Sequence, residues 1–278
     1  LIRGKKRNVA WRVLDAKFFG LPQQRRRLYL LAGGIDFHPE QVLFEKRTNH
    51  PIEYPKSSLQ FEKDGHTFEI FREYTDCLYS AYGTKWNGNA AANNGSLFVV
   101  QDGRIRRLSP LECERLMGFP DNYTYRANAK KTNRYQAIGN SWAVPVVRWI
   151  GERLLSGGDP QINITANWLE LSGFVTHLKD NASFFNLGND IVFLPNESQI
   201  NCTTSPECVV IGSMKDIVSN DAPDDIYISP VGCYGIVRRK EERNLTINPR
   251  LEEVLLKISS EMSAEEIEKR SRIQHRGR

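Results

Sequence analysis

The sequence has little cysteine and no long hydrophobic run. Its five cysteines are scattered along the chain and odd in number (Cys77, Cys113, Cys202, Cys208 and Cys233), which argues against a disulfide framework and favours a reducing compartment. No apolar stretch approaches the roughly 20 residues of a membrane-spanning helix, and none follows the basic N-terminal residues as in a signal peptide. These absences speak against secreted, membrane-spanning, collagen-like and disulfide-rich classes, so we expect a cytoplasmic protein with no membrane partner.

The composition is that of an ordinary globular protein, and the charge is distributed unevenly along the chain. The chain has 278 residues, 40% hydrophobic and 26% charged, enough for one large domain or two to three smaller ones. Residues 1–150 carry 24 Lys and Arg against 14 Asp and Glu, whereas residues 151–278 carry 14 against 19. A basic first half indicates contact with a polyanion. The chain opens with Leu1 rather than methionine, and we expect it to start within a longer protein.

Strands and loops are expected in two parts of the chain. Residues 8–19 predict a strand followed by a turn, and residues 28–32 predict a second strand that stops at Gly33. Residues 35–104 are rich in Asn, Gly, Thr and Tyr and lack helical periodicity, which indicates short strands joined by long loops. Alternating apolar segments in residues 159–235 predict a small β-rich or mixed module.

Helices are expected over residues 109–119, 141–155, 248–262 and 263–274. In the first, Ser109, Pro110 and Glu112 occupy the N-cap, first and third positions, where each satisfies or spares a free backbone N–H. In the second, Ser141 is the expected N-cap, and Gly157 follows the end of the helix.

The first block with chemical potential is GLPQQRRR (20–27). Gln23, Arg25 and Arg27 alternate, so on an extended chain their side chains face one way. A guanidinium group presents several donors in a planar fork, which suits a phosphate or the edge of a base. The alternative is a solvated basic strand.

Two later blocks combine helix signals with polar groups. RRLSPLECERLMGFPDNY (106–123) is a capped helix that runs into a turn, with Arg106 at its entrance. RYQAIGNSWAVPV (134–146) contains Gly139, which lets a backbone approach a ligand. Asn140 and Ser141 offer an amide, a hydroxyl and the N–H groups of a helix start. Both blocks also have a purely structural interpretation. Most residues of the first block are explained by the capped helix and its turn, and Gly-Asn-Ser alone is a common helix cap.

In this order and at these distances, the three blocks resemble the C-terminal half of the DNA cytosine-5 methyltransferases of bacteria and phages. Pro-Gln-x-Arg-x-Arg is similar to the family's eighth motif, Arg-Leu-Ser-Pro-x-Glu with Met-Gly-Phe-Pro-Asp to the ninth, and Gln-Ala-Ile-Gly-Asn-Ser with Val-Pro-Val to the tenth. The resemblance covers residues 8–155. It implies an α/β fold: part of a Rossmann-like methyltransferase domain, with an inserted, mostly irregular or β target recognition domain and an α+β C-terminal extension.

The resemblance also implies an activity. These enzymes transfer a methyl group from S-adenosylmethionine to C5 of a cytosine that has left the double helix. A cysteine thiolate adds to C6 and a glutamate bonds a ring nitrogen. By resemblance, Arg27 contacts the flipped cytosine, Arg25 supports that pocket and Gln23 orders the strand. Asn140 and Ser141 line the cofactor site. The implied setting is the cytoplasm of a bacterium, with the gene bacterial or phage-encoded, in a restriction–modification or phage self-protection context.

The expected division follows the motifs. Residues 1–34 end the catalytic domain, 35–104 form the target recognition domain, 105–157 return to the catalytic domain, and 158–278 form an extension of unknown role. Base readout of double-stranded DNA in the major groove is expected from 35–104. The side chains expected to contact DNA are Gln23, Thr75, Tyr82, Thr84, Lys85, Asn87 and Arg106.

Other family motifs are missing from the sequence. It contains no Pro-Cys dipeptide, no Glu-Asn-Val and no early Gly-rich loop, which carry the nucleophile, the acid and most of the cofactor pocket in the family. We therefore expect the chain to be inactive alone and to need an N-terminal half, either as the missing part of the same chain or as a separate subunit. The alternatives are a non-catalytic DNA-binding subunit or regulator, and an RNA-directed relative. Cys202 and Cys208 lack a second ligand pair, so no metal is expected.

Overall fold

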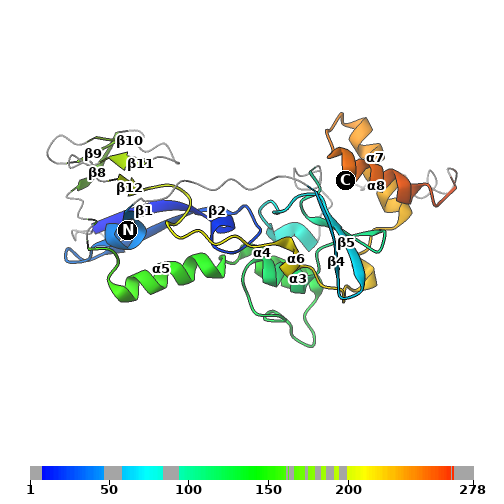
Figure 1. The fold of residues 1–278 in the computed structure, drawn as a ribbon, viewed down its shortest axis with the longest axis horizontal. Coiled ribbons are helices and arrows are strands. Elements are labelled where there is room, and N and C mark those ends of the chain that lie inside the picture. The colour runs from blue at the N-terminus through cyan, green and yellow to red at the C-terminus, as the bar shows by residue number, and fades with distance from the viewer. Residues whose placement is uncertain are drawn as a thin grey trace, which may run out of the picture. The chain divides into compact units, whose positions relative to one another are not determined.

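The computed structural model of the protein describes two compact units. The described residues are 8–46, 58–83, 94–160, 162, 166–172, 175–178, 183–185, 191–193, 199–263 and 265; for the strands between 166 and 199 the description covers the backbone alone. Unit 1 comprises Leu1–Glu53 and Trp142–Gly212, and unit 2 comprises Tyr54–Ser141 and Ser213–Arg278 (Figure 1). Both units mix helices and strands, as predicted. Within the described residues, no helix is long and apolar enough to cross a membrane.

Unit 1 is built around an antiparallel hairpin. Strand β1 (Asn8–Asp15) pairs with β2 (Arg26–Gly33) along its whole length. The other elements of this unit are η1 (Ala16–Phe18), α1 (Pro39–Leu43), β3 (Glu45–Lys46), α5 (Val144–Ser156), β8 (Ala166–Ser172), β9 (Val175–Leu178), β10 (Ser183–Phe185), β11 (Ile191–Phe193) and β12 (Gln199–Asn201). Strands β8–β9–β10 form one sheet and β3–β12–β11 another. Both strands that the sequence predicts before residue 34 are thus confirmed.

A buried arginine connects distant parts of unit 1. The Arg12 guanidinium on β1 donates to the carbonyl oxygens of Leu43 (2.6 Å), Thr203 (2.9 Å) and Ser205 (2.6 Å). It also lies 3.3 Å from the Glu45 carboxylate. These bonds join β1, the end of α1 and the chain after β12, so residues beyond the three sequence motifs contribute to the packing of the hairpin.

Unit 2 contains a four-stranded antiparallel sheet in the order β4–β5–β6–β7, with core on both faces. Its elements are β4 (Leu59–Lys63), β5 (His66–Ile70), η2 (Ser80–Gly83), β6 (Phe98–Gln101), β7 (Arg104–Arg107), α3 (Pro110–Leu116), α4 (Lys131–Asn140), α6 (Met214–Ile217), η3 (Asp224–Ile226), α7 (Pro230–Glu242) and α8 (Pro249–Ser259). Side chains alternate along β6. Val99 faces the cluster with α3, α4 and α6, whereas Phe98 and Val100 face the cluster with α7 and α8.

The C-terminal residues are therefore not a separate extension. Residues 158–212 belong to unit 1 and residues 213–278 to unit 2, where α7 and α8 supply one of the two cores. Three cationic side chains also bind carbonyl oxygens at the end of α6 and just after it. Lys63 donates to Val218 (2.8 Å), Arg115 to Ile217 (3.2 Å) and Arg106 to Ser219 (3.0 Å). The expected recognition segment 35–104 is likewise divided, because residues 35–53 pack in unit 1.

Helix ends follow the sequence signals in most cases. The Ser109–Glu112 capping box is formed, and Gly157 ends α5 in the left-handed conformation with φ of 81°. Pro249 opens α8 as predicted. The expected helix 263–274 lies outside the described residues apart from residues 263 and 265.

The predicted N-cap role of Ser141 is wrong. An unpredicted helix, α4, ends at Asn140, so Ser141 is its C-cap, and α5 begins only at Val144. The Ser141 hydroxyl donates to the Ile138 carbonyl oxygen at 2.5 Å, which satisfies a carbonyl at the end of a helix rather than an N–H group at the start of one. The apolar positions of α4 are few, and this weak periodicity explains why the sequence does not predict it.

Gly139 has a packing role that differs from the expected one. A Cβ atom at this position would lie 2.6 Å from the backbone nitrogen of Ser80 and 2.6 Å from the carbonyl carbon of Tyr79. Since real Cβ atoms do not approach backbone this closely, only glycine lets α4 pack against η2. The close approach predicted for a ligand is made by the protein's own chain.

We predict that Gly139→Ala destabilises the protein by about 1–3 kcal/mol, because overpacking against rigid backbone outweighs the better helix propensity of alanine. The matched control is Gly151→Ala on α5, where an added Cβ meets nothing within 4 Å; this change should stabilise by up to about 1 kcal/mol. Urea unfolding of both variants measures the difference. Equal effects of the two substitutions would contradict the packing role of Gly139.

Candidate functional site

The basic segment of unit 1 divides into a buried and an exposed part. Gln23 and Arg25 are buried, whereas Arg27 is exposed. β2 begins only at Arg26, so residues 23–25 are not part of the strand and the simple alternation does not hold across all three. The prediction that the three side chains face one way is therefore corrected: Arg27 is at the surface, whereas Gln23 and Arg25 are buried.

Asp15, which precedes the basic block and belongs to none of the three motifs, holds the start of this segment. Its Oδ1 accepts a hydrogen bond from the backbone N–H of Arg25 at 2.8 Å, and the Ala16 N–H donates to the Arg25 carbonyl oxygen at 3.2 Å. Burial raises the pKa of the Asp15 carboxyl, and the hydrogen bond from Arg25 counteracts this shift. An Asp between a strand and the turn before Gly-Leu-Pro is the signal that could have identified it.

Exposed aromatic and cationic groups lie next to this segment within unit 1. Tyr29 forms an edge-to-face pair with Trp142 at 6.4 Å between ring centroids, and Trp142 is 67% exposed. Burial raises the pKa of Tyr29, while the charges of Arg25 and Arg27 lower it, so both guanidinium groups act on the same hydroxyl. Cations beside a flat apolar surface are suited to an anionic aromatic ligand such as a nucleotide.

Asn140 and Ser141 lie in unit 2, at the end of α4. The Asn140 side chain is exposed and its carboxamide can both donate and accept hydrogen bonds. Ser141 is half-buried, with its hydroxyl bonded to Ile138. The sequence predicts the free N–H groups of a helix start at Ser141. They do not lie there, because α5 starts three residues later, at Val144.

Two of the expected DNA-reading residues are core residues. Thr75 is fully buried. Tyr82 is 4% exposed, and its hydroxyl donates to the Leu97 carbonyl oxygen (3.0 Å) and accepts from the Leu108 N–H (2.8 Å). Both expectations are wrong for this reason: residue type alone does not distinguish a polar reader on the surface from a polar group buried in the core. Three more of the seven, Thr84, Lys85 and Asn87, lie outside the described residues, and Gln23 is buried.

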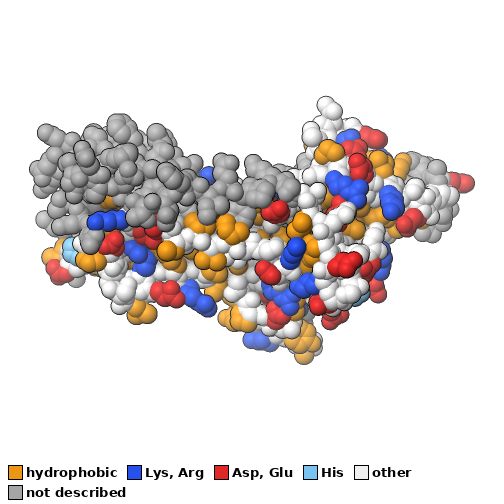
Figure 2. Space-filling view, viewed as in Figure 1, with side chains coloured by type: hydrophobic (Ala, Val, Ile, Leu, Met, Phe, Trp, Pro, Cys, Tyr) orange, Lys and Arg blue, Asp and Glu red, His pale blue; other side chains and the backbone are white. Residues whose placement is uncertain are grey.

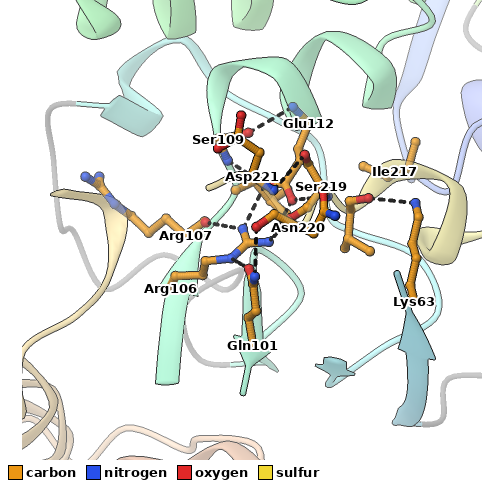
Figure 3. Close-up of polar contacts among 12 residues, drawn as sticks. Lys63, Gln101, Arg106, Arg107, Ser109, Glu112, Ile217, Ser219, Asn220 and Asp221 are labelled. Carbon is orange, nitrogen blue, oxygen red and sulfur yellow. Dashed lines mark hydrogen bonds and ion pairs between the residues drawn. The ribbon is translucent and has the colours of Figure 1, made fainter. Parts of the chain in front are cut away.

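Arg106 is also a core residue rather than a DNA contact. It is fully buried on β7, and all five of its N–H groups are bonded (Figure 3). Nε donates to Gln101 Oε1 at 2.9 Å. Nη1 donates to the Arg107 carbonyl oxygen at 3.0 Å and to Glu112 Oε2 at 2.9 Å, and Nη2 donates to Glu112 Oε1 at 2.8 Å and to the Ser219 carbonyl oxygen at 3.0 Å. No donor is left over for a phosphate or a base.

The Glu112 carboxylate is satisfied in the same way. Besides the two bonds from Arg106, it accepts from the backbone N–H of Ser109 at 2.6 Å and from that of Ser219 at 2.7 Å. Burial by itself lowers the pKa of Arg106, but the charge and hydrogen bonds of Glu112 raise it above its ordinary value. This Arg106–Glu112 pair joins β7, the start of α3 and the chain after α6 (Figure 3).

Comparison with known proteins identifies the sequence motifs with a family. The model of the C-5 cytosine-specific DNA methylase family matches residues 7–95 and 60–156, together more than half of the chain. The type II methyltransferase M.MspI of Moraxella sp is 33% identical over 159 residues, covering 51% of this chain and 37% of that protein. A protein named DNA N-6-adenine-methyltransferase, from Escherichia phage P1, is 26% identical and is matched over 55% of this chain and 37% of its own length.

The chain thus spans less than half the length of these curated relatives. Among solved structures, the Entamoeba histolytica methyltransferase EhMeth matches 54% of this chain and 54% of its own, with 16% identity and a TM-score of 0.31.

We predict that Glu112→Gln destabilises the protein by about 3–5 kcal/mol, because it leaves the buried Arg106 charge without its counter-charge. The matched control is Glu253→Gln, which removes a 65% exposed partner of Arg250 and should cost no more than about 1 kcal/mol. Chemical unfolding of the full chain provides the measurement. If Glu112→Gln were as mild as the control, the pair would not be what holds unit 2 together.

Proposed function

Because the chain belongs to the C-5 cytosine-specific DNA methylase family, we propose that it is the C-terminal part of an enzyme that methylates C5 of a flipped cytosine in DNA. The observation that carries the proposal is the match of the family to residues 7–156, together with an apolar sheet face that is partly exposed in the described part of the chain. The nucleophile and the acid come from an N-terminal part, since the sequence contains neither Pro-Cys nor Glu-Asn-Val. The reaction takes place in the cytoplasm of a bacterium, whether the gene is bacterial or phage-encoded.

This partly exposed apolar face belongs to the β1–β2 hairpin. Residues directly opposite each other in an antiparallel pair lie on the same face, and the pairs here are Val9 with Ala32, Trp11 with Leu30 and Val13 with Leu28. The β1 members are half-buried and the β2 members exposed, Leu28 by 58% and Leu30 by 44%. Hydrophobic side chains are visible on the surface over β2 and α5 (Figure 2).

An apolar face of this kind is normally covered in α/β proteins, where layers pack on both sides of a sheet. A two-stranded hairpin by itself is also only marginally stable in water. The relatives are more than twice as long as the matched segment, so an N-terminal part of the enzyme, in the same chain or as a separate subunit, is the proposed cover. This part would supply the remaining strands of the methyltransferase sheet.

The chain's own residues have proposed roles in binding. Arg27 contacts the flipped cytosine, and its exposure at the start of β2 supports this role. Arg25 and Gln23, which are buried, hold the segment in place. Asp15 fixes the Arg25 backbone through a 2.8 Å hydrogen bond. The base must leave the stack to be reached, and the exposed Trp142 beside Tyr29 offers a ring against which it can stack.

S-adenosylmethionine, when bound, supplies the methyl group. The exposed carboxamide of Asn140 fits a polar cofactor because it can donate and accept at once. In the proposed cofactor site Ser141 is the neighbour of Asn140. Its hydroxyl donates a hydrogen bond to the Ile138 carbonyl oxygen. The recognition of double-stranded DNA is assigned to unit 2, including residues 84, 85 and 87 of its recognition segment.

The absence of a Pro-Cys dipeptide from the sequence also favours a second candidate function. In this alternative the chain is a non-catalytic DNA-binding subunit or regulator derived from such an enzyme. The decisive assay is methyl transfer from labelled S-adenosylmethionine to duplex DNA, with and without an N-terminal part that carries the missing motifs. Analysis of the product nucleosides separates 5-methylcytosine from N6-methyladenine.

We predict that the reconstituted pair forms 5-methylcytosine and that Arg27→Ala lowers its turnover roughly 100-fold or more, the scale of losing one positioned charged contact. Arg148→Ala, which removes an exposed arginine from α5 of the same unit, serves as the control and should leave turnover unchanged. Duplex binding without methylation by any pair would support the regulator instead, and methylation of RNA rather than DNA would overturn both.

We further predict that Leu30→Glu prevents association with the N-terminal part, because it places a charge in the middle of the face to be covered. Leu256→Glu on α8 is the matched control, since Leu256 is 49% exposed and lies in the other unit. Co-purification of the tagged N-terminal part with each variant provides the measurement. Retention of the partner by Leu30→Glu would show that this face is not the interface.

A further inference from the structure

Unit 2 contains a cavity of about 440 Å³ between β7 and the start of α7. Its lining includes Arg107 of β7, Asp225 and Tyr227 near η3, and Ser229, Gly235 and Arg239 of the α7 region. All of these except Arg107 lie beyond residue 156, where the match to the family ends. The site already proposed uses none of them.

The Arg239 side chain is directed into this cavity by the surface of α7. A Cβ atom at Gly235 would lie 3.3 Å from Arg239 Nη1, so the guanidinium folds back over Gly235 toward the N-terminus of the helix, as helical side chains do. Gly232, Gly235 and Arg239 follow helical spacing on one face, and all three line the cavity. The absence of side chains at the two glycines leaves room in front of the guanidinium.

The charges around the cavity leave Arg239 uncompensated. Among the described residues, no ion pair or side-chain hydrogen bond links it to a carboxylate, and its pKa is lowered by burial and by the charges of Arg238 and Arg243, against a smaller opposite effect of Glu242. The carboxylate of Asp225 is already paired with Lys131. Arg107 also lines the cavity, and its Nη1 donates to the Tyr82 carbonyl oxygen at 3.2 Å.

From this geometry we propose that the cavity binds a phosphate group through Arg239, with Arg107 close by. A guanidinium presents parallel N–H donors that match two phosphate oxygens, and Ile226, Ile228 and Val231 on the wall suit the apolar side of a sugar. The proposal deepens the proposed function and rests on it: the phosphate is a backbone phosphodiester of the DNA held by unit 2. Residues 225–239 thereby extend the DNA-binding surface beyond the family match.

The test is the salt dependence of duplex binding by the full chain, measured by fluorescence anisotropy with a labelled 24-base-pair duplex. Each phosphate contact contributes about 0.9 to the slope of log affinity against log salt concentration. Arg239→Ala should therefore lower the slope by about 0.9 and weaken binding to all sequences alike. Arg239→Lys should retain most of the slope. Lys257→Ala, which removes an exposed charge from α8 in the same unit, should leave the slope unchanged.

A slope that is unaltered in Arg239→Ala, with wild-type chain binding duplex normally, overturns this inference and leaves the proposed function intact. If the wild-type chain binds no duplex, DNA recognition by this chain fails, and a second measurement decides the phosphate site separately. In it, the full chain is treated with phenylglyoxal, with and without inorganic pyrophosphate, and labelling of Arg239 is read by mass spectrometry. Protection of Arg239 supports a site for a free phosphate compound, and equal labelling overturns the site.

Discussion

The buried pair of Arg106 and Glu112 is the interaction on which the rest of unit 2 depends. A charged group inside a protein is tolerated only when its charge and its hydrogen bonds are matched, and here five donors meet their acceptors without remainder. The acceptors come from β6, from the start of α3 and from Ser219 after α6. Forming the pair therefore requires that residues 101–112 and Ser219, which is 113 positions from Arg106, come together.

This requirement gives a structural role to the residues that resemble the family's ninth motif. The Arg-Leu-Ser-Pro-x-Glu run includes Glu112 and follows Arg106, so the carboxylate of this run takes part in a buried junction of unit 2. The same junction explains why residues 213–263 belong to unit 2. They provide the carbonyl and N–H of Ser219, and with α7 and α8 they cover the second face of the sheet. Readout of DNA by unit 2 would then depend on residues beyond the family match.

Unit 1 differs, because the two faces of its hairpin are not equally buried. One face of β1 and β2 packs through Ala10, Arg12 and Leu14, which are buried, while the other face leaves Leu28 and Leu30 exposed. Removing apolar surface of this kind from water stabilises the folded or associated state. In the proposed function, this exposed face is the surface on which an N-terminal part of the enzyme would pack.

Local sequence rules sufficed for the features that depend on neighbouring residues. The Ser109–Glu112 capping box, the left-handed glycine after α5 and Pro249 at the start of α8 follow from backbone hydrogen bonding within a few positions. The hairpin strands follow from their local content of β-branched and aromatic residues. The order of three motifs sufficed for the family. Tertiary structure alone decided that Arg106, Thr75 and Tyr82 are buried, that Gly139 touches the chain at Ser80, and that Ser141 ends a helix. The reason is physical: burial depends on partners such as Ser219, 113 positions from Arg106, and no local pattern encodes which distant group will satisfy a charge.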